Sequence, residues 1–168
     1  IRGIFFDAAG VFYDRHESTG RYARRLLEEA GYAGELSESD QARKKSLHVQ
    51  ATEGRISHDD YWDRLLLLHG VIAQPERASL VKRMLEHTHE VFAYPGGRET
   101  MAELKRRGFI LGLVTDTIYP VDWKMAWVAK AGVAEYIDIV ACSTVLGAHK
   151  PEPAIYLNAL AQARLTPA

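Results

Sequence analysis

The hydrophobic and polar positions along the chain change pattern twice. Residues 4–12 begin as an apolar run that leads into Asp7 and a glycine-containing turn. This is typical of a buried parallel strand that presents a carboxylate at its carboxyl end. From Ser18 to about Glu90 the apolar residues recur at helical spacing, and no strand is expected there. From Tyr94 onward helix and strand patterns alternate, so the chain is predicted to be an α/β unit split in sequence by a helical insertion.

The middle stretch is expected to hold four amphipathic helices. The first begins at about Ser18, and a more polar helix follows over residues 39–52. Ser57 begins a capping sequence before the third helix, and Pro75 opens the fourth at a first-turn position. Helices joined by short links can bury their apolar stripes against one another. Residues 15–91 are therefore predicted to form a small helical bundle.

The alternating part of the chain predicts a parallel sheet. The expected elements are helices over 98–107, 120–131 and 152–163 and strands over 109–114 and 136–141. Such a succession implies right-handed crossovers between parallel strands, the first of which leads to Asp7. We expect a Rossmann-like α/β core of residues 1–14 and 92–168 around the inserted four-helix subdomain.

Composition and charge exclude several classes of protein. The 168 residues are 47% hydrophobic and 26% charged, which is typical of a globular chain with a real core. The net charge is -1, and the short basic runs 43–45 and 105–107 are interpreted as solvated helix faces, so no nucleic-acid partner is expected. No apolar run approaches about 18 residues, which argues against a membrane span. Cys142 is the one cysteine and is expected to be a buried, inert thiol in a reducing, cytoplasmic setting.

Candidate chemistry stands where the predicted strands end. Asp7 follows the first strand, Thr115 and Asp116 follow the second, and Lys150 follows the third. Because the carboxyl ends of parallel strands meet at one edge of a sheet, these side chains are expected to lie together. A carboxylate that attacks, a hydroxyl that holds an oxygen and an ammonium that offsets charge suit a small anionic substrate. His149, next to Lys150, is a further candidate for substrate contact.

Three segments resemble the motifs of the haloacid dehalogenase (HAD) superfamily of hydrolases. Residues 6–14, Phe-Asp-Ala-Ala-Gly-Val-Phe-Tyr-Asp, are similar to its first motif, Asp-x-Asp-Gly-Thr-Leu-x-Asp. Residues 114–116, Val-Thr-Asp, resemble the second motif, and residues 149–156, His-Lys-Pro-Glu-Pro-Ala-Ile-Tyr, closely resemble the third. The likeness extends over nearly the whole chain and implies the branch with a helical C1-type cap inserted after the first motif.

The resemblance implies a role for each matching residue. Asp7 would be the nucleophile that forms a covalent aspartyl intermediate, Thr115 would bind the transferred group, and Lys150 would balance the charge of Asp7 and the substrate. In the phosphatase members Mg²⁺ is bound by the nucleophile and by a backbone carbonyl, which here are Asp7 and Ala9. The residues expected to contact the substrate are Gly10, Asp116 and His149.

Two departures from the family pattern bear on function. The second Asp of the first motif, which in the phosphatases protonates the leaving oxygen and then activates water, is Ala9. Loss of a general acid or base typically slows a reaction by about 10²- to 10⁴-fold. The family's fourth motif, an acidic pair that completes the Mg²⁺ site, would follow a strand that should begin where the chain ends at Ala168. We therefore expect the protein to continue beyond Ala168 or the missing strand to come from elsewhere, and these residues alone do not complete a metal site.

Three hypotheses stay open on the sequence. The favoured one is a hydrolase that uses Asp7 on a small phosphorylated metabolite and is slowed by Ala9. The second is a carbon-bond hydrolase related to the dehalogenases or phosphonatases, which also lack this acid. The third is a catalytically silent HAD-like protein that binds a phosphorylated ligand or a protein partner. A monomer or homodimer is expected.

Histidine and tryptophan residues outside the motifs are given structural interpretations. His87 and His89 stand two apart on a predicted helix and so point in different directions, which is unlike a metal-ligand pair. Both are expected to face solvent. The residues expected to serve mainly in packing are Trp62, Trp123 and Trp127.

Overall fold

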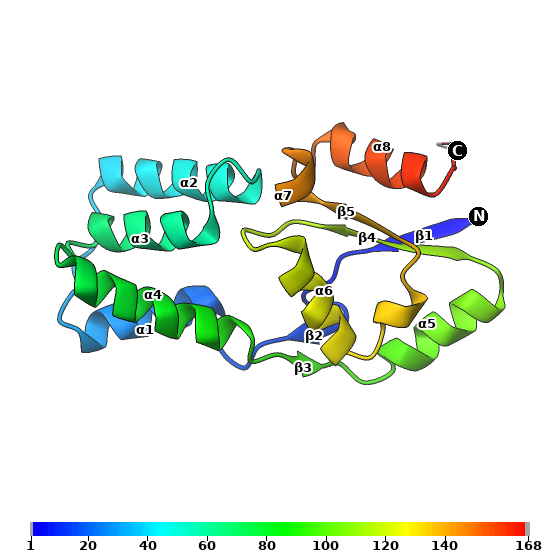
Figure 1. Cartoon of the computed structure of the whole chain (residues 1–168), viewed down its shortest axis with the longest axis horizontal. Coiled ribbons are helices and arrows are strands. Elements are labelled where there is room, and N and C mark those ends of the chain that lie inside the picture. Colours follow the sequence, from blue (N-terminus) through cyan, green and yellow to red (C-terminus); the bar gives the residue numbers. More distant parts are fainter. Residues whose placement is uncertain (1, 167–168) are drawn as a thin grey trace.

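The computed structural model describes residues 2–166 and contains a three-stranded parallel sheet (Figure 1). Its strands are β1 (Gly3–Phe6), β4 (Ile110–Thr115) and β5 (Ile139–Cys142), in the spatial order β1-β4-β5. Gly3 lies opposite Ile110 and Gly112 lies opposite Ile139, and both pairings are parallel. The carboxyl ends of the three strands therefore meet at one edge, and the predicted α/β fold with a parallel sheet is confirmed.

Three helices cover the two faces of this sheet: α5 (Gly97–Arg106), α6 (Val121–Lys130) and α8 (Pro153–Gln162). Successive side chains of the central strand β4 alternate between the faces, as they do in any strand. Leu111 and Leu113 are fully buried in a cluster with Trp127 of α6. Val114 is buried in the opposite cluster, with Ile155 of α8. Both faces are thus covered, as expected for a parallel sheet.

Four further helices lie between the first strand and the rest of the sheet in sequence: α1 (Thr19–Glu29), α2 (Glu38–Thr52), α3 (His58–Leu68) and α4 (Gln74–Thr88). They bury their own apolar cluster, in which Leu26, Leu66 and Met84 are fully enclosed. Ser57 caps α3 as the sequence predicted, because its hydroxyl accepts the Asp60 N–H at 3.0 Å. That these helices work as a cap, and the limits drawn between insertion and core, stay predictions.

Two short strands that the sequence pattern did not predict connect the sheet to the four helices. β2 (Tyr13–Asp14) and β3 (Phe92–Ala93) pair antiparallel, one before α1 and the other after α4. The Tyr94 hydroxyl donates to Asp14 Oδ2 at 3.0 Å and reinforces the pair. Two-residue strands are too short to show an alternating pattern, so no sequence signal marked them.

The third predicted strand begins later than expected. Ala134–Tyr136 form a 3₁₀ turn, η1, and β5 starts only at Ile139. The Asp138 side chain accepts the Leu111 N–H at 2.8 Å, so this residue joins the sheet through its carboxylate before the strand itself begins. One short helix, α7 (Ser143–Leu146), follows β5 and was also not predicted.

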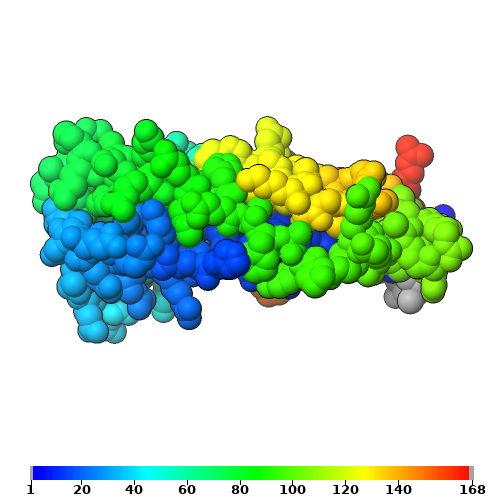
Figure 2. All heavy atoms as spheres, turned by 90° about the horizontal axis from the view of Figure 1, so that it is seen from below, coloured from blue at the N-terminus to red at the C-terminus, as the bar shows by residue number. Residues whose placement is uncertain are grey.

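The molecule is elongated, with α1–α4 at one end and the α/β unit at the other (Figure 2). Both marked chain ends lie at the α/β end, far from the four helices (Figure 1). Within the described residues β1 pairs on one side only, so it forms one edge of the sheet. No helix of residues 2–166 is long and apolar enough to cross a bilayer.

Candidate active site

The fold brings Asp7 and Lys150 into contact at the carboxyl edge of the sheet. Asp7 directly follows β1, whose last residue, Phe6, lies opposite Leu113 of β4. Lys150 stands in the loop between α7 and α8, and its Nζ lies 2.6 Å from Asp7 Oδ2. The side chains of Asp7 and Lys150 keep 43% and 25% of their surface exposed, so a small molecule can reach the pair. A charge-assisted hydrogen bond of this length fixes the carboxylate.

Asp7 stays ionised because its hydrogen bonds outweigh its partial burial. Burial acts to raise its pKa, whereas the Lys150 ammonium and the Ala8 N–H, 2.7 Å from Oδ1, act to lower it. The net result is a pKa below the ordinary value of an aspartate. The ionised carboxylate is the form that can attack phosphorus or carbon.

Thr115 supplies an unpaired hydroxyl at the same edge. It is the last residue of β4 and is fully buried. Its Oγ1 has no hydrogen-bond partner among the described residues. A buried hydroxyl without a partner typically costs about 1–3 kcal/mol, and a ligand oxygen would offset that cost.

Asp116 contacts the loop that carries Lys150. Its Oδ1 and Oδ2 lie 3.2 and 3.3 Å from the backbone nitrogen of Lys150, and the carboxylate accepts this N–H. The interaction positions the residue whose ammonium contacts Asp7. Direct contact of Asp116 with the substrate stays a prediction.

The other two expected substrate contacts lie in different surroundings. Gly10 has φ 74°, which favours glycine, and its N–H already donates to the Tyr13 carbonyl at 2.9 Å. His149 Nδ1 lies 3.3 Å from Glu53 Oε1 and 3.0 Å from Glu152 Oε1, so it links the end of α2 to the start of α8. The substrate-binding roles of Gly10 and His149 stay predictions.

Lys124 was missed by the reasoning from sequence. It stands in α6, and only 4% of its surface is exposed. Burial lowers the pKa of its ammonium to about 8, although the Asp7 carboxylate acts in the opposite direction. A signal was available, because Lys124 stands three and four residues before Trp127 and Val128 and so shares their helix face.

A second missed group surrounds Tyr119, in the loop between β4 and α6. The Tyr119 hydroxyl, Trp62 Nε1 and Thr88 Oγ1 are all buried, and none has a hydrogen bond of good geometry within residues 2–166. Burial raises the pKa of Tyr119, while the side chains of Trp62, Thr19 and Thr88 act to lower it. Polar atoms from α1, α3 and α4 thus gather around this loop, and Trp62 offers a donor there as well as apolar surface.

The expectation that His87 faces solvent was wrong. Only 7% of its surface is exposed, its Nε2 lies 2.9 Å from the Glu17 carbonyl, and its ring stacks on Tyr22 with 4.0 Å between centroids. His89 is also partly enclosed, because its Nδ1 accepts the Trp127 indole N–H at 3.2 Å. Helix packing on both sides of α4 explains the difference. Cys142, in contrast, is buried as predicted.

The donors around Asp7 fit part of a Mg²⁺ site. The Asp7 carboxylate and the Ala9 carbonyl are hard oxygen ligands of the kind that Mg²⁺ prefers. Within residues 2–166 the one group of three acidic or histidine ligands is Glu53, His149 and Glu152, which does not include Asp7. Mg²⁺ is commonly held by one or two carboxylates together with substrate phosphate and water. Asp7 and Ala9 would therefore need such additional ligands.

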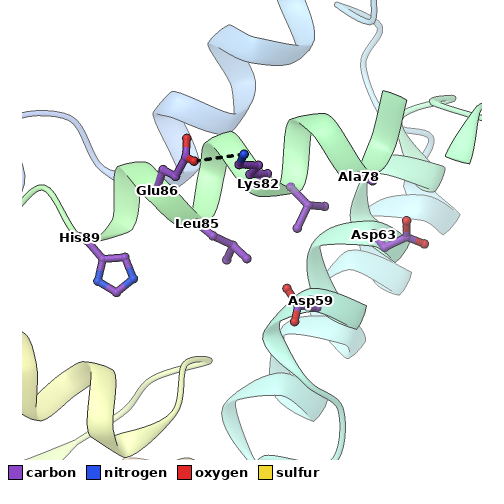
Figure 3. Close-up of a pocket in the computed structure, with 8 residues that line it drawn as sticks. Asp59, Asp63, Ala78, Lys82, Leu85, Glu86 and His89 are labelled. Atoms are coloured by element: carbon purple, nitrogen blue, oxygen red, sulfur yellow. Dashed lines mark ion pairs between the residues drawn. The ribbon is translucent and has the colours of Figure 1, made fainter. Parts of the chain in front are cut away.

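Two of the cavities that lie away from Asp7 are among the helices of the insertion. One of about 500 Å³ lies between α3 and α4, and Figure 3 shows Lys82 and Glu86 paired along α4, with His89 at its end. A larger one of about 870 Å³ is lined by α1, α2, α3 and the loop between α1 and α2. Neither is lined by Asp7 or Lys150, so the candidate site at the sheet edge lies outside both.

Comparison with protein families decides the assignment. Residues 1–168 match the model of the haloacid dehalogenase-like hydrolases. The chain belongs to this family. The resemblance drawn from the motifs is confirmed, and the chain is a HAD-family hydrolase.

Individual relatives include both phosphatases and dehalogenases. A glyceraldehyde 3-phosphate phosphatase of Methanopyrus kandleri is 28% identical over 95% of this chain and 69% of its own. An (S)-2-haloacid dehalogenase 1 of Pseudomonas sp. (strain CBS-3) is 27% identical over 93% of this chain and 68% of its own. The crystal structure of a 2-haloacid dehalogenase from Pseudomonas syringae pv. Tomato DC3000 matches with a TM-score of 0.63 at 22% identity, covering 98% of this chain and 74% of that one. The last likeness supports the fold alone.

Proposed function

We propose that this HAD-family hydrolase cleaves a small phosphorylated metabolite through a covalent aspartyl intermediate on Asp7. The observation that carries the proposal is the 2.6 Å contact between Asp7 and Lys150 at the edge where Thr115 keeps an unpaired hydroxyl. Asp7 would attack phosphorus, Thr115 would donate to a phosphoryl oxygen, and Lys150 would offset the charge that develops. The similarity to the M. kandleri phosphatase supports a phosphate ester as substrate.

The charges near Asp7 favour an anionic substrate. Lys150 pairs with Asp7, and the ammonium of Lys124 and the guanidinium of Arg15 lie close enough to affect the local pKa values. Bound by Asp7 and the Ala9 carbonyl, Mg²⁺ would supply further charge neutralisation at the phosphoryl oxygens. The protein groups would still bind the ester, orient it for attack and hold Asp7 ionised.

A dehalogenase is the second candidate, and Ala9 is the observation that favours it. A departing halide needs no proton, so the missing carboxyl group would cost that reaction little. The nucleophile, hydroxyl and ammonium would serve it equally well, since the substrate of such an enzyme is also an anion. The 27% identity to the Pseudomonas dehalogenase supports this alternative.

The two candidates are separated by assays on one preparation of the intact protein. Hydrolysis of p-nitrophenyl phosphate is measured with and without Mg²⁺, and halide release from 2-chloropropionate is measured in parallel. Wild type is compared with Asp7→Asn and Ala9→Asp. The nitrophenolate leaving group needs little protonation, so a working nucleophile should be detected despite Ala9.

Each outcome favours a different account. Phosphate release that Asp7→Asn abolishes and Ala9→Asp accelerates supports the proposed phosphatase. Halide release that depends on Asp7, without phosphate release, supports the dehalogenase instead. If neither phosphate nor halide is released, and Ala9→Asp restores no activity, both candidate functions are overturned and a binding role is favoured.

A further inference from the structure

Three metal-ligating side chains meet where the inserted helices contact the α/β unit. Glu53 directly follows α2, and His149 and Glu152 stand in the loop that leads into α8. His149 Nδ1 lies 3.3 Å from Glu53 Oε1 and 3.0 Å from Glu152 Oε1. All three donor atoms lie within 4.8 Å of one another. The cluster therefore joins one end of the insertion to the loop that carries Lys150.

The Glu53 carboxylate is the least accessible member of this cluster. Only 8% of its side chain is exposed, and its Oε2 is buried without a hydrogen bond of good geometry to any of residues 2–166. Arg55 contacts this oxygen, but the arginine side chain is itself 63% exposed, and an ion pair with so exposed a partner contributes little. A buried carboxylate is costly unless it is paired or binds a metal. The charge of Glu53 is therefore poorly compensated by the protein alone.

One nitrogen of His149 faces both carboxylates. This Nδ1 is buried and makes no hydrogen bond of good geometry within the described part of the chain, although an oxygen of each glutamate lies close to it. A ring nitrogen carries at most one proton, so it can donate to only one of the two oxygens. The His149 backbone N–H donates to Glu152 Oε1 at 3.2 Å and holds that oxygen beside the ring. Three electron-pair donors thus converge on one small space, which suits a metal ion better than a proton.

The donor set indicates which kind of metal would bind. One imidazole nitrogen with two carboxylate oxygens suits Zn²⁺ and similar transition metals, whereas Mg²⁺ and Ca²⁺ prefer oxygen ligands alone. Ligand atoms about 2.0–2.1 Å from a tetrahedral Zn²⁺ lie about 3.3 Å from one another. The two separations from His149 Nδ1, 3.3 and 3.0 Å, are close to this value. The side chains of Glu152 and His149 are 46% and 30% exposed, so a metal ion can enter from their side and water can supply a fourth ligand.

We propose that Glu53, His149 and Glu152 bind a divalent transition metal ion, Zn²⁺ in the first instance, which fastens the end of α2 to the loop before α8. The site shares no residue with the Mg²⁺ site considered above, and it does not depend on which substrate the hydrolase cleaves. His149 is next to Lys150, whose ammonium contacts Asp7. The bound metal would therefore hold the inserted helices and the candidate active site in one arrangement.

Zinc binding is measured by isothermal titration calorimetry on the intact protein without an affinity tag, after a chelator has removed bound metal. The buffer contains excess Mg²⁺, which occupies sites built from oxygen ligands alone. Wild type is compared with Glu53→Gln and Glu152→Gln, which remove the charge of a ligand and keep its shape, and with His149→Asn, which removes the imidazole. Glu99→Gln, an exposed position in α5 outside the cluster, is the matched control.

We expect wild type and Glu99→Gln to bind one equivalent of Zn²⁺ that the cluster variants bind at least about 10²-fold more weakly, since a direct ligand should matter no less than an outer-shell partner. Adding Zn²⁺ should slow amide hydrogen exchange at residues 49–54 and 148–153 in wild type and not in Glu53→Gln. Co²⁺ bound in place of Zn²⁺ should show the visible absorption of a four-coordinate site without a thiolate-to-metal band, which distinguishes this site from one at Cys142.

Zinc that binds wild type and the three cluster variants with equal affinity is held elsewhere and overturns the proposal, as does a wild type that binds no Zn²⁺ at micromolar concentration. Binding that changes hydrogen exchange at neither segment overturns the fastening of α2. If Glu53→Gln does not fold, Glu152→Gln decides the question, because its partly exposed side chain can be replaced without disturbing buried packing. None of these measurements uses turnover, so failure of the proposed hydrolase function would leave them unchanged.

Discussion

The ionisation of Asp7 depends on a balance between burial and hydrogen bonding. Burial alone would raise its pKa and favour the neutral acid, but Lys150 and the Ala8 N–H hold it ionised. The contact between Lys150 and Asp7 therefore keeps the carboxylate ionised, in addition to holding the loop between α7 and α8 in place. Lys150 is the one side chain that donates a hydrogen bond to Asp7 within residues 2–166, so its removal should change the pKa of Asp7.

Lys150→Met should shift the acid limb of the pH profile for kcat/KM to higher pH. With the ammonium gone, the burial that raises the pKa of Asp7 is opposed only by the Ala8 N–H and the charge of Lys124. Ionised Asp7 is then lost at a higher pH than in wild type. The rate at the plateau should also fall, by about 10²- to 10³-fold, as for loss of one charge-stabilising group.

Rate profiles on p-nitrophenyl phosphate from pH 4 to pH 8 would measure both effects. Lys105→Met, which removes the exposed ion pair with Asp138, serves as the control and should leave the profile unchanged. An acid limb that stays in place in Lys150→Met would contradict the account of Asp7.

Lys124→Met should stabilise the fold at neutral pH. Burial lowers the pKa of Lys124 from 10.5 to about 8, so below pH 8 the folded state carries a charge that is better solvated when the chain unfolds. The penalty is on the order of 3 kcal/mol. As the pH rises from 8 towards 10.5, the folded state loses the proton while the unfolded state keeps it, and wild-type stability increases relative to the variant.

Urea unfolding of both proteins at pH 7 and pH 10 measures this difference. The advantage of Lys124→Met should be largest at pH 7 and should shrink by pH 10. An equal difference at both values, or a variant less stable at pH 7, would show that the ammonium finds favourable partners in the folded protein.

The end of α2 and the short helix α7 approach each other closely. Gly54, just after α2, has φ 68°, and a Cβ at this position would collide with the Thr144 carbonyl oxygen. Glu53, the neighbouring residue, contacts His149 of the loop that carries Lys150. The geometry of this junction therefore affects how the four helices meet the candidate active site.

Gly54→Ala should destabilise the protein more than Gly31→Ala. Both glycines have a positive φ, which costs alanine about 1–2 kcal/mol, but a Cβ at Gly31 meets nothing within 4 Å. The collision with Thr144 adds a further cost of about 1–3 kcal/mol, as for overpacking. Urea unfolding of the two variants gives the comparison directly. Equal losses would mean that α2 and α7 can separate without cost.

How far the sequence predicted the elements depended on their length and on local signals. The helix over 58–68 was well predicted because Ser57 caps it and its apolar stripe is long. Asp7, Thr115 and Lys150 were placed at one edge because strand ends are regular. The strands at residues 13–14 and 92–93 carry too few residues for a pattern. The burial of Lys124 was missed because the helical pattern was identified from apolar residues alone, and a lysine on a buried helix face is not counted among them.

The described part of the molecule has three apolar clusters, and Leu85 and Ile118 pack against two of them. One cluster lies inside α1–α4 and the other two cover the faces of the sheet. Arg15 crosses between them, donating through Nε and Nη2 to the Thr88 carbonyl at 2.9 and 2.6 Å while its guanidinium lies 4.5 Å from the Trp127 ring centroid. Polar and aromatic groups around α6 thus contribute to the contact between the two ends of the molecule.

Trp123→Ala should loosen α3 and α4 from the sheet without unfolding the sheet itself. The Trp123 ring lies 4.7 Å from His58 at the start of α3, 4.5 Å from His89 after α4 and 5.7 Å from Tyr119 in a stacked arrangement. Contacts of this kind contribute about 0.5–1.5 kcal/mol each beyond the area they bury. Amide hydrogen exchange should become faster near His58 and His89, while protection of β4 should stay as in wild type.

Leu157→Ala, an exposed position on α8, is the control and should change exchange at neither place. If exchange in β4 accelerates as much as at His58, Trp123 stabilises the molecule as one unit and the two ends are not separable. If only His58 and His89 respond, the aromatic groups around α6 determine how closely the four helices approach Asp7. Turnover in Trp123→Ala should then fall mainly through kcat, because the four helices would no longer be held in place beside the candidate site.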